Sequence, residues 1–293
     1  LWPGAARLEG EPPQAEVIER FVERFRPRGL VRGAITPSYG LTEGTGTVTG
    51  EVSLARPRTL QVDPQRLASG TLSASAGGRT LVSNGRFSAG VRAVIADPAT
   101  RTACAPGAIG ELWLRGDTIA THYVADPALV SERFAELAGA PGERYLRTGD
   151  LGALLDGELY LTGRAHDLII VRGENVFPDD IELIARQSAP FIPASGAAAF
   201  GIPLDGSEVV ALVLEVPEGV ADLSASLDAI RGALVRRLGV RIARLACVRE
   251  GALPKTPIGK LKRSEARRML LDGAFATLDL ESNAKVEPSI EMQ

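Results

Sequence analysis

The segment LPKTPIGKLKR, residues 253–263, holds a lysine whose setting could serve phosphate chemistry. Lys260 follows Gly259, which leaves room for a ligand, in a loop that Pro254 and Pro257 restrict. It is not a P-loop lysine, because that motif requires a glycine at the position that Pro254 occupies. Two interpretations of these residues remain open: an ammonium that a turn carries to a ligand, or a solvated charge in a basic run.

The chain before this loop contains a helical and mixed segment followed by a β-rich segment. AEVIERFVERF, 15–25, repeats apolar residues at helical spacing, and Pro27 with Gly29 ends the predicted helix. AITPSYGLTEGTGTVTG, 34–50, reads as a short buried strand, a turn and a loop. From about Thr80 to Gly163, the runs TLVS, VRAVIAD, IGELWLR and GELYLTG alternate with turn dipeptides. This pattern predicts a small, twisted, barrel-like sheet.

After Arg164 the sequence predicts a compact α+β unit. Its expected elements are the strand DLIIVRG, the helix DDIELIARQ, the strand EVVALVLEV, the helix DAIRGALVRRL, the strand VRIARLACV, the Lys260 loop and the helix SEARRMLLDG. Residues 281–293 are polar and aperiodic, which is typical of a tail. We therefore expect domains at 1–163 and 164–280.

The bulk composition is that of an ordinary globular protein. The 293 residues are 45% hydrophobic and 24% charged, with a net charge of −3. This balance argues against a general nucleic-acid surface. The basic residues between Arg241 and Arg268 lack interleaved aromatics and are predicted to be mostly a solvated helix face.

Neither a membrane span nor a disulfide framework is predicted. No apolar run approaches the length that a span requires. Cys104 and Cys247 lie far apart, with neither metal-ligand nor disulfide spacing, which favours the reducing cytoplasm. The chain starts at Leu1, not at methionine, which hints at a fragment.

Four segments in a fixed order carry a family resemblance. They are YGLTE (39–43), YLRTGDL (145–151), GRAHDLIIVRGENVFPDDIE (163–182) and the Lys260 loop. Each alone is a weak signal, but together they resemble the second half of the acyl-adenylate-forming ligases, which include acyl-CoA synthetases, luciferases and peptide-synthetase adenylation domains. The resemblance covers nearly the whole chain. It implies an incomplete α/β (α+β) ligase fold: the end of the large AMP-binding domain with a β-barrel-like subdomain, then a small mobile C-terminal domain.

Within that superfamily the chain is similar to the fatty acyl-AMP ligases. GDLGALLDGELYLTGRAHDLIIVRGEN and FPDDIE look like their sequences, and so does the extra segment from Leu54 to Arg79. We therefore divide the first domain into an α/β edge (1–50), an insertion (51–79) and a β-rich subdomain (80–163). Because SGTLSASAGG is low in complexity, the insertion could be a flexible surface loop. The resemblance implies an insertion that hinders the movement admitting coenzyme A.

The resemblance also implies a reaction. A fatty acid and ATP form acyl-AMP and pyrophosphate, and the acyl group then passes to an acyl carrier protein or to a polyketide or peptide synthase. Lys260 corresponds to the lysine that reaches the carboxylate and the α-phosphate. Glu43 would help to hold Mg²⁺, which prefers carboxylate oxygens, and Thr42 would offer its hydroxyl to the α-phosphate.

Further residues are assigned to the nucleotide and to the hinge on the same basis. Tyr39, followed by Gly40, would present a flat face beside the adenine. Asp150, expected in a turn after a strand, would accept hydrogen bonds from the ribose hydroxyls, and Arg164 would contact the ribose or phosphate. His166 stands at the family's hinge position, which is usually aspartate or lysine, and is given no catalytic role.

One expected part of the family pattern is missing from the chain. The family's phosphate-binding loop lies well upstream of YGLTE, and only 38 residues precede Tyr39 here. We therefore expect a fragment without this loop, from which the acyl chain length cannot be read. Two alternatives stay open, a fragment of an acyl-CoA synthetase and a non-catalytic remnant that docks a carrier protein.

Overall fold

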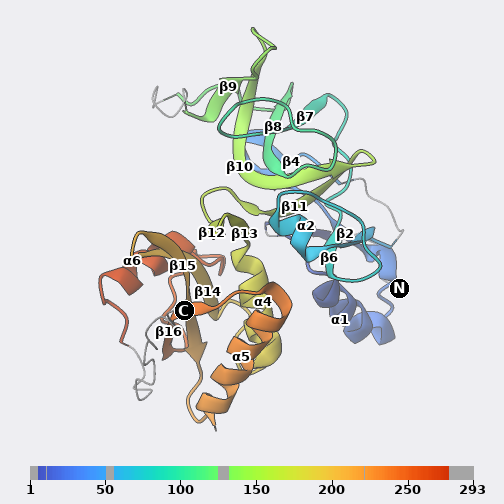
Figure 1. Ribbon diagram of the computed structural model, residues 1–293. Coiled ribbons are helices and arrows are strands. Elements are labelled where there is room, and N and C mark those ends of the chain that lie inside the picture. Colours follow the sequence, from blue (N-terminus) through green and yellow to red (C-terminus); the bar gives the residue numbers. More distant parts are fainter. Residues whose placement is uncertain (1–5, 11, 51–55, 125–131, 221, 277–293) are drawn as a thin grey trace. The chain divides into compact units, whose positions relative to one another are not determined.

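The chain forms two compact units that divide between His166 and Asp167. The computed structural model in Figure 1 describes residues 6–10, 12–50, 56–124, 132–220 and 222–276. The predicted tail, 281–293, and the first residues of the predicted insertion, 51–55, lie outside this part of the chain.

The first unit begins with a parallel strand pair and a helix. Strands β1 (Ala6–Leu8) and β2 (Ile35–Pro37) pair in parallel, and α1 (Ala15–Phe25) lies between them in sequence (Figure 1). The helix has the predicted bounds, but its predicted apolar stripe is only half buried. Ile18 and Val22 are buried, whereas Val17, Phe21 and Phe25 are 52%, 47% and 43% exposed. In the described part of the chain, the apolar cluster that packs on α1 reaches only the Ile18–Val22 side.

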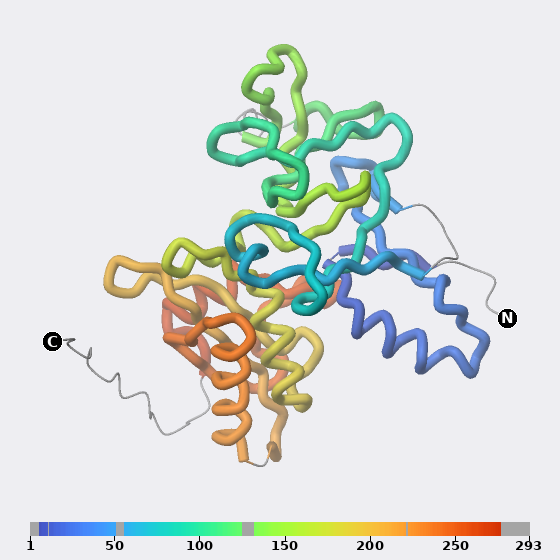
Figure 2. Tube along the Cα trace, turned by 45° about the vertical axis from the view of Figure 1, so that its right-hand side comes forward, coloured from blue at the N-terminus to red at the C-terminus, as the bar shows by residue number. Residues whose placement is uncertain are grey.

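The insertion is an ordered element where the structure describes it. It contains β5 (Thr59–Val62) and α2 (Pro64–Ala68), and it leads into β6 (Arg79–Val82), which pairs antiparallel with β5. Figure 2 shows the segment as a blue-to-cyan loop that folds back on itself. Backbone hydrogen bonds tie it to the loop before β8, from Leu72 to Gly107 at 2.7 Å and from Ile109 to Gly70 at 2.8 Å. The described part of the insertion therefore has regular structure and backbone contacts with the β-rich region.

The rest of the first unit is a five-stranded antiparallel sheet in which the predicted runs VRAVIAD, IGELWLR and GELYLTG form three strands, whereas TLVS belongs to β6, outside this sheet. It contains β7 (Val91–Ala96), β8 (Gly110–Gly116), β9 (Phe134–Glu136), β10 (Arg144–Leu155) and β11 (Glu158–Arg164), in the order β11-β10-β8-β7 with β9 also on β10. Strand β8 is buried on both faces: Leu112 and Leu114 face one apolar cluster and Trp113 faces another. The sheet therefore has a core on each side of its central strand.

The second unit is a three-stranded sheet between helices. The chain runs through the strand pair β12 (Ile169–Val171) and β13 (Glu174–Val176), then α4 (Pro178–Ser188), β14 (Ala197–Leu204), β15 (Ser207–Val216), α5 (Leu223–Leu238), β16 (Ile242–Arg249) and α6 (Arg263–Leu271). The sheet order is β14-β15-β16. Alternate residues of β14 belong to opposite cores: Ala199 to the one that includes residues of α4 and α5, and Phe200 to the one that includes residues of α6.

Membrane-spanning helices and disulfides are absent from the described residues. No helix there is long and apolar enough to cross a membrane. Cys104 and Cys247 are both free thiols, and burial raises the pKa of the Cys247 thiol to about 11.

Candidate active site

The YGLTE segment forms a tight hairpin in the first unit. Two-residue strands β3 (Gly40–Leu41) and β4 (Gly46–Thr47) flank a single 3-10 turn at Thr42–Gly44. A side chain at position 40 would meet the carbonyl oxygen of Gly46 at 2.5 Å, so the close strand approach requires glycine there. The hairpin leaves Thr42 exposed and Glu43 half-buried.

Asp150 lies inside a long strand, not in a turn after one. It belongs to the 12-residue strand β10, at an irregularity where the register with β8 shifts between Arg147 and Leu151. Gly149 before it has a φ of 75°, a left-handed conformation that favours glycine. Such a bulge redirects one side chain without ending the strand. The predicted turn was therefore wrong, because the TGD segment is a bulge within the sheet.

Three of the predicted nucleotide residues are in contact. The hydroxyl of Tyr39 donates a hydrogen bond to Oδ2 of Asp150 at 2.6 Å, and Nε of Arg164 lies 3.1 Å from Oδ1 of Asp150. Arg164 is the cross-strand partner of Asp150 on β11. A carboxylate has about four acceptor sites, so Asp150 keeps capacity for hydroxyl donors beside these two partners.

The Tyr39 ring is only 6% exposed and packs in the core of the β-rich sheet. Burial, the negative charge of Asp150 and the hydrogen bond to it raise the pKa of the Tyr39 hydroxyl far above its ordinary value. The hydroxyl therefore stays a donor at neutral pH. The predicted place of its ring beside an adenine stays a prediction.

Glu43 has a charged environment that the sequence did not reveal. Its Oε1 accepts a hydrogen bond from the Tyr123 hydroxyl at 2.5 Å, and the guanidinium of Arg133 lies 3.7 Å away. Partial burial acts to raise the pKa of the Glu43 carboxyl. The Tyr123 hydrogen bond, a backbone hydrogen bond and the Arg133 charge outweigh it and leave the pKa below its ordinary value. Glu43 is therefore ionised at neutral pH.

The donor set at Glu43 fits Mg²⁺ held largely by another ligand. Within the described residues, no group of three or more histidines, cysteines and acids could hold a metal by itself. Mg²⁺ is commonly bound by one or two carboxylates together with substrate phosphates and waters. A single ionised carboxylate beside an exposed hydroxyl, Thr42, suits that mode.

Glu111 supports the Asp150 bulge and was missed by the sequence analysis. This carboxylate is 3% exposed. It accepts hydrogen bonds from the backbone N–H of Gly149 at 3.0 Å, from Nε and Nη2 of Arg147 at 3.0 and 2.9 Å, and from the Trp113 indole at 2.9 Å. Its one visible signal was a glutamate inside the otherwise apolar run IGELWL. Glu111 fixes the backbone immediately before Asp150.

Lys260 lies at a closed turn of the second unit. The N–H of Lys260 donates to Oγ1 of Thr256 at 3.0 Å, and the N–H of Thr256 donates to the carbonyl of Lys260 at 2.7 Å. Gly259 has a φ of 84°, which favours glycine, and a side chain there would meet nothing within 4 Å. The backbone of Lys260 therefore lies in a turn, which both interpretations allow.

Most basic residues between Arg241 and Arg268 are exposed, as predicted, but Arg263 is an exception. Arg263 begins α6, and its side chain is 14% exposed among the carboxylates of Asp167, Asp179 and Glu182. A basic residue can be recognised as buried only when its acidic partners are known, and these lie more than 80 residues away. His166, the predicted hinge residue, is exposed and is the last residue of the first unit.

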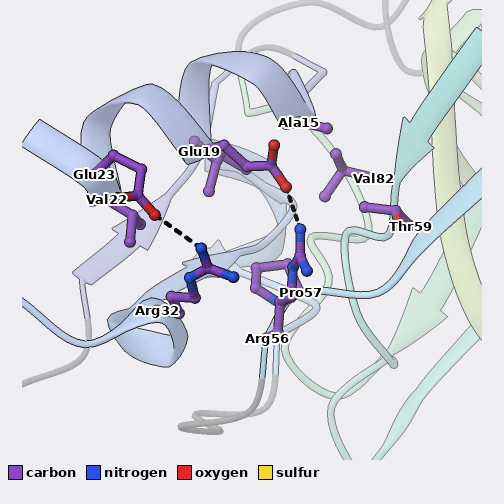
Figure 3. Close-up of a pocket in the computed structure, with 10 residues that line it drawn as sticks. Ala15, Glu19, Val22, Glu23, Arg32, Arg56, Pro57, Thr59 and Val82 are labelled. Carbon is purple, nitrogen blue, oxygen red and sulfur yellow. Dashed lines mark hydrogen bonds and ion pairs between the residues drawn. The ribbon is translucent and has the colours of Figure 1, made fainter. Parts of the chain in front are cut away.

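A separate cavity of about 120 Å³ lies between α1 and the β5–β6 pair. Figure 3 shows two ion pairs at its rim, from Arg32 to Glu23 and from Arg56 to Glu19. Its apolar lining includes Val22. None of the predicted site residues lines this cavity.

Comparisons with known proteins agree with the sequence and the geometry. The family model described as AMP-binding enzyme matches residues 5–124. The chain is 33% identical over 287 residues to the medium-chain-fatty-acid–(acyl-carrier-protein) ligase JamA of Moorena producens, covering 94% of this chain and 48% of that protein. It is 32% identical over 302 residues to the long-chain-fatty-acid–AMP ligase FadD32 of Mycolicibacterium smegmatis, covering 90% and 48%.

A solved structure leads to the same family. It comes from a study of fatty acyl-adenylate ligases from E. coli and L. pneumophila, and it is similar with a TM-score of 0.78 at 29% identity, covering 92% of this chain and 47% of that one. The chain thus spans about half the length of the relatives that it matches. Over that span, it belongs to the acyl-adenylate-forming superfamily of AMP-binding enzymes.

Proposed function

We propose that the protein containing this chain is a fatty acyl-AMP ligase. A fatty acid carboxylate attacks the α-phosphorus of ATP, the bond from that phosphorus to the bridging oxygen breaks, and pyrophosphate leaves. In the second step a carrier-protein thiol attacks the acyl carbon and AMP leaves, which forms a thioester. The observation that carries this proposal is the similarity, over about nine tenths of the chain, to relatives named as fatty-acid–AMP and acyl-carrier-protein ligases.

Lys260 is the cation of the first step. Two negatively charged groups meet when a carboxylate approaches a triphosphate, and further charge develops in the transition state. Because its backbone is fixed in a closed turn, only the Lys260 side chain has to be ordered for the ammonium to offset that charge. The hydrogen bonds between Thr256 and Lys260 support this role.

The first unit binds the nucleotide in this account. Asp150 accepts hydrogen bonds from the ribose hydroxyls, and Arg164 contacts the ribose or a phosphate. Tyr39, followed by Gly40, lies beside the adenine. Bound Mg²⁺ would neutralise phosphate charge. Glu43, ionised beside Tyr123 and Arg133, is the carboxylate that would hold it.

The remaining polar groups orient the phosphate and the units. Thr42 is exposed beside Glu43 and donates its hydroxyl to the α-phosphate. His166 is the pivot between the two steps, which fits its place at the unit boundary. Hinges of this kind are a few residues that absorb large backbone changes.

A carrier protein is the proposed acceptor, in place of coenzyme A. The support is the insertion, which has regular structure and backbone hydrogen bonds to the loop before β8. An ordered insertion can restrict a movement, whereas a flexible loop would yield to it. A location in the cytoplasm stays part of this proposal.

The test is a product analysis on the natural full-length protein. With ATP, Mg²⁺ and fatty acids of several lengths, acyl-AMP and pyrophosphate should form in equal amounts. Adding a holo carrier protein should consume acyl-AMP, while adding coenzyme A should yield little thioester. Failure to form acyl-AMP with every acid would overturn the proposal. Efficient acyl-CoA formation would overturn only the choice of acceptor.

A further inference from the structure

The Lys260 turn closes a hairpin whose two stems each reach a buried carboxylate. Lys255 and Leu261 form an antiparallel bridge, and the N–H of Lys262 donates to the carbonyl of Pro254 at 2.9 Å. Residues 254–262 are thus a small closed loop, with Lys260 on its outgoing arm opposite Thr256 and next to Leu261. The position of the Lys260 backbone depends on what holds the base of this loop.

The incoming stem is held by Glu215 of β15. This carboxylate is 0% exposed. Its Oε1 accepts the N–H of Leu253 at 2.8 Å, and its Oε2 accepts the Nζ of Lys255 at the same distance. One buried side chain therefore binds both the backbone and a side chain at the start of the loop.

The outgoing stem is held through Arg263. Its Nε and Nη2 donate to the two oxygens of Glu182 on α4, each at 2.8 Å. Nη2 also donates to Asp179 at 2.5 Å, and Nη1 donates to Asp167 at 3.2 Å. Glu182 in turn accepts the N–H of Ala199 on β14 at 3.0 Å. Arg263 therefore connects the end of the loop to the start of the unit, to α4 and to the sheet.

The ion pairs at Glu215 and Glu182 resist opening, because separating a buried charge from its partner raises the free energy. A buried carboxylate without its cation keeps an uncompensated charge, so breaking such a pair is strongly unfavourable. Bidentate arginine contacts also fix direction as well as distance. The two carboxylates lie on different elements, β15 and α4. Fixation at two separate points restricts rotation of the hairpin, which a single anchor would permit.

We propose that Lys255 and Arg263, held by Glu215 and Glu182, are positioning residues for Lys260. They do not touch substrate; they fix the hairpin so that the ammonium enters the reaction in one orientation. This inference rests on the role of Lys260 given under the proposed function.

The first test measures the hairpin directly on this chain. Hydrogen exchange is followed in the amides of residues 256–262 and, as an internal reference, of β15. Arg263→Gln and, separately, Lys255→Met should speed hairpin exchange by about 10-fold or more, while β15 changes by less than about 3-fold. Arg268→Gln is the matched control on α6, because the Arg268 side chain is 67% exposed and pairs with the exposed Asp272 at 3.6 Å.

Two variants keep this test decisive if one of them unfolds the unit. Unfolding would raise exchange in β15 as well, and the other variant then decides. Unchanged hairpin exchange in a folded variant of either anchor would overturn the proposal.

The second test asks whether the anchors act through Lys260. In the full-length protein, Arg263→Gln should lower kcat for acyl-AMP formation with little change in the KM for ATP, and Arg263→Lys should restore part of the rate. In a Lys260→Ala background, Arg263→Gln should have almost no further effect, because both changes remove the same ammonium contribution. If Arg263→Gln lowered kcat by the same factor in the Lys260→Ala background as in the parent, Arg263 would have a general structural role, and the proposal would be overturned.

The two tests separate this inference from the proposed function. If Lys260→Ala left acyl-AMP formation unchanged while anchor variants still loosened the hairpin, the role of Lys260 would be wrong and the anchoring right. If Lys260→Ala abolished the reaction while the anchors left both exchange and kcat unchanged, the positioning inference alone would be wrong.

Discussion

Asp150 and Arg164 lie directly opposite each other on the antiparallel strands β10 and β11, with Nε of Arg164 3.1 Å from Oδ1 of Asp150. The Tyr39 hydroxyl donates a hydrogen bond to the other carboxylate oxygen of Asp150, Oδ2. This arrangement holds the carboxylate in one orientation before any ligand binds. A fixed acceptor loses little conformational freedom when hydroxyl groups bind to it.

Asp150→Asn should weaken ATP binding in the full-length protein. Hydrogen bonds to a charged acceptor contribute about 1.5–3 kcal/mol each, so the Kd for ATP should rise by about 10- to 100-fold. Equilibrium dialysis with labelled ATP measures it. Asp156→Asn is the matched control, since Asp156 is exposed at the β10–β11 turn with a φ of 53°, which asparagine tolerates. If the two variants had equal Kd values for ATP, Asp150 would not be part of the nucleotide site.

Tyr39→Phe should destabilise the first unit by about 1–2 kcal/mol. The change deletes a buried hydrogen bond to an ionised acceptor and leaves Asp150 with one partner fewer. Urea unfolding followed by tryptophan fluorescence suits the test, because Trp113 is buried in this unit. The control Tyr145→Phe loses a longer bond, 3.2 Å to the more exposed Glu143, and should cost less than half as much. If Tyr145→Phe lowered the free energy of unfolding more than Tyr39→Phe, the Tyr39 hydrogen bond would contribute little to the stability of the first unit.

The stability of the second unit should depend on pH through Glu182. Burial raises the pKa of its carboxyl to about 7, from an ordinary 4.5, although the Arg263 hydrogen bond and charge act in the opposite direction. Because the folded pKa exceeds the unfolded one, ionising Glu182 costs more in the folded state than in the unfolded state, and the ion pair with Arg263 offsets only part of that cost. The corresponding contribution to stability is complete below the unfolded pKa and is lost as the pH rises through the folded pKa.

Glu182→Gln removes this dependence. Between about pH 5 and about pH 8, the free energy of unfolding of the parent should fall relative to the variant by about 1–3 kcal/mol. The methyl NMR signal of Met269, which packs against the second core of this unit, reports its unfolding in urea. Glu265→Gln, which removes an exposed pair with Lys262, should show no such trend. A parallel pH dependence in parent and Glu182→Gln would contradict the raised pKa.

The sequence predicted elements well where the local pattern was strong. The helix at 15–25 and the strands of the β-rich region came from periodicity and turn dipeptides, and both are present. Strand β14 was missed because its start, Ala197 to Ala199, consists of small residues with weak strand propensity. Its position between two helical layers supplies the burial that the sequence alone did not reveal.

The sequence predicted the residues of the candidate site better than it predicted the contacts among them. Tyr39, Asp150 and Arg164 were proposed from motifs, and their mutual contacts depend on a register shift that no local pattern encodes. Tyr123 was overlooked because it lies 80 residues from Glu43, its hydrogen-bond partner. Long-range pairs of this kind follow from the fold, not from spacing along the chain.

In the proposed reaction, Lys260 stabilises charge in the adenylation transition state. In the full-length protein, Lys260→Ala should slow single-turnover acyl-AMP formation by about 100-fold or more. The Kd for ATP should change by less than about 3-fold, because the developing charge is met mainly in the transition state. The exposed neighbour Lys262, changed to alanine, should leave the rate near that of the parent. A Lys260→Ala rate within about 3-fold of the parent would contradict the account, and Lys260 would then be a solvated charge.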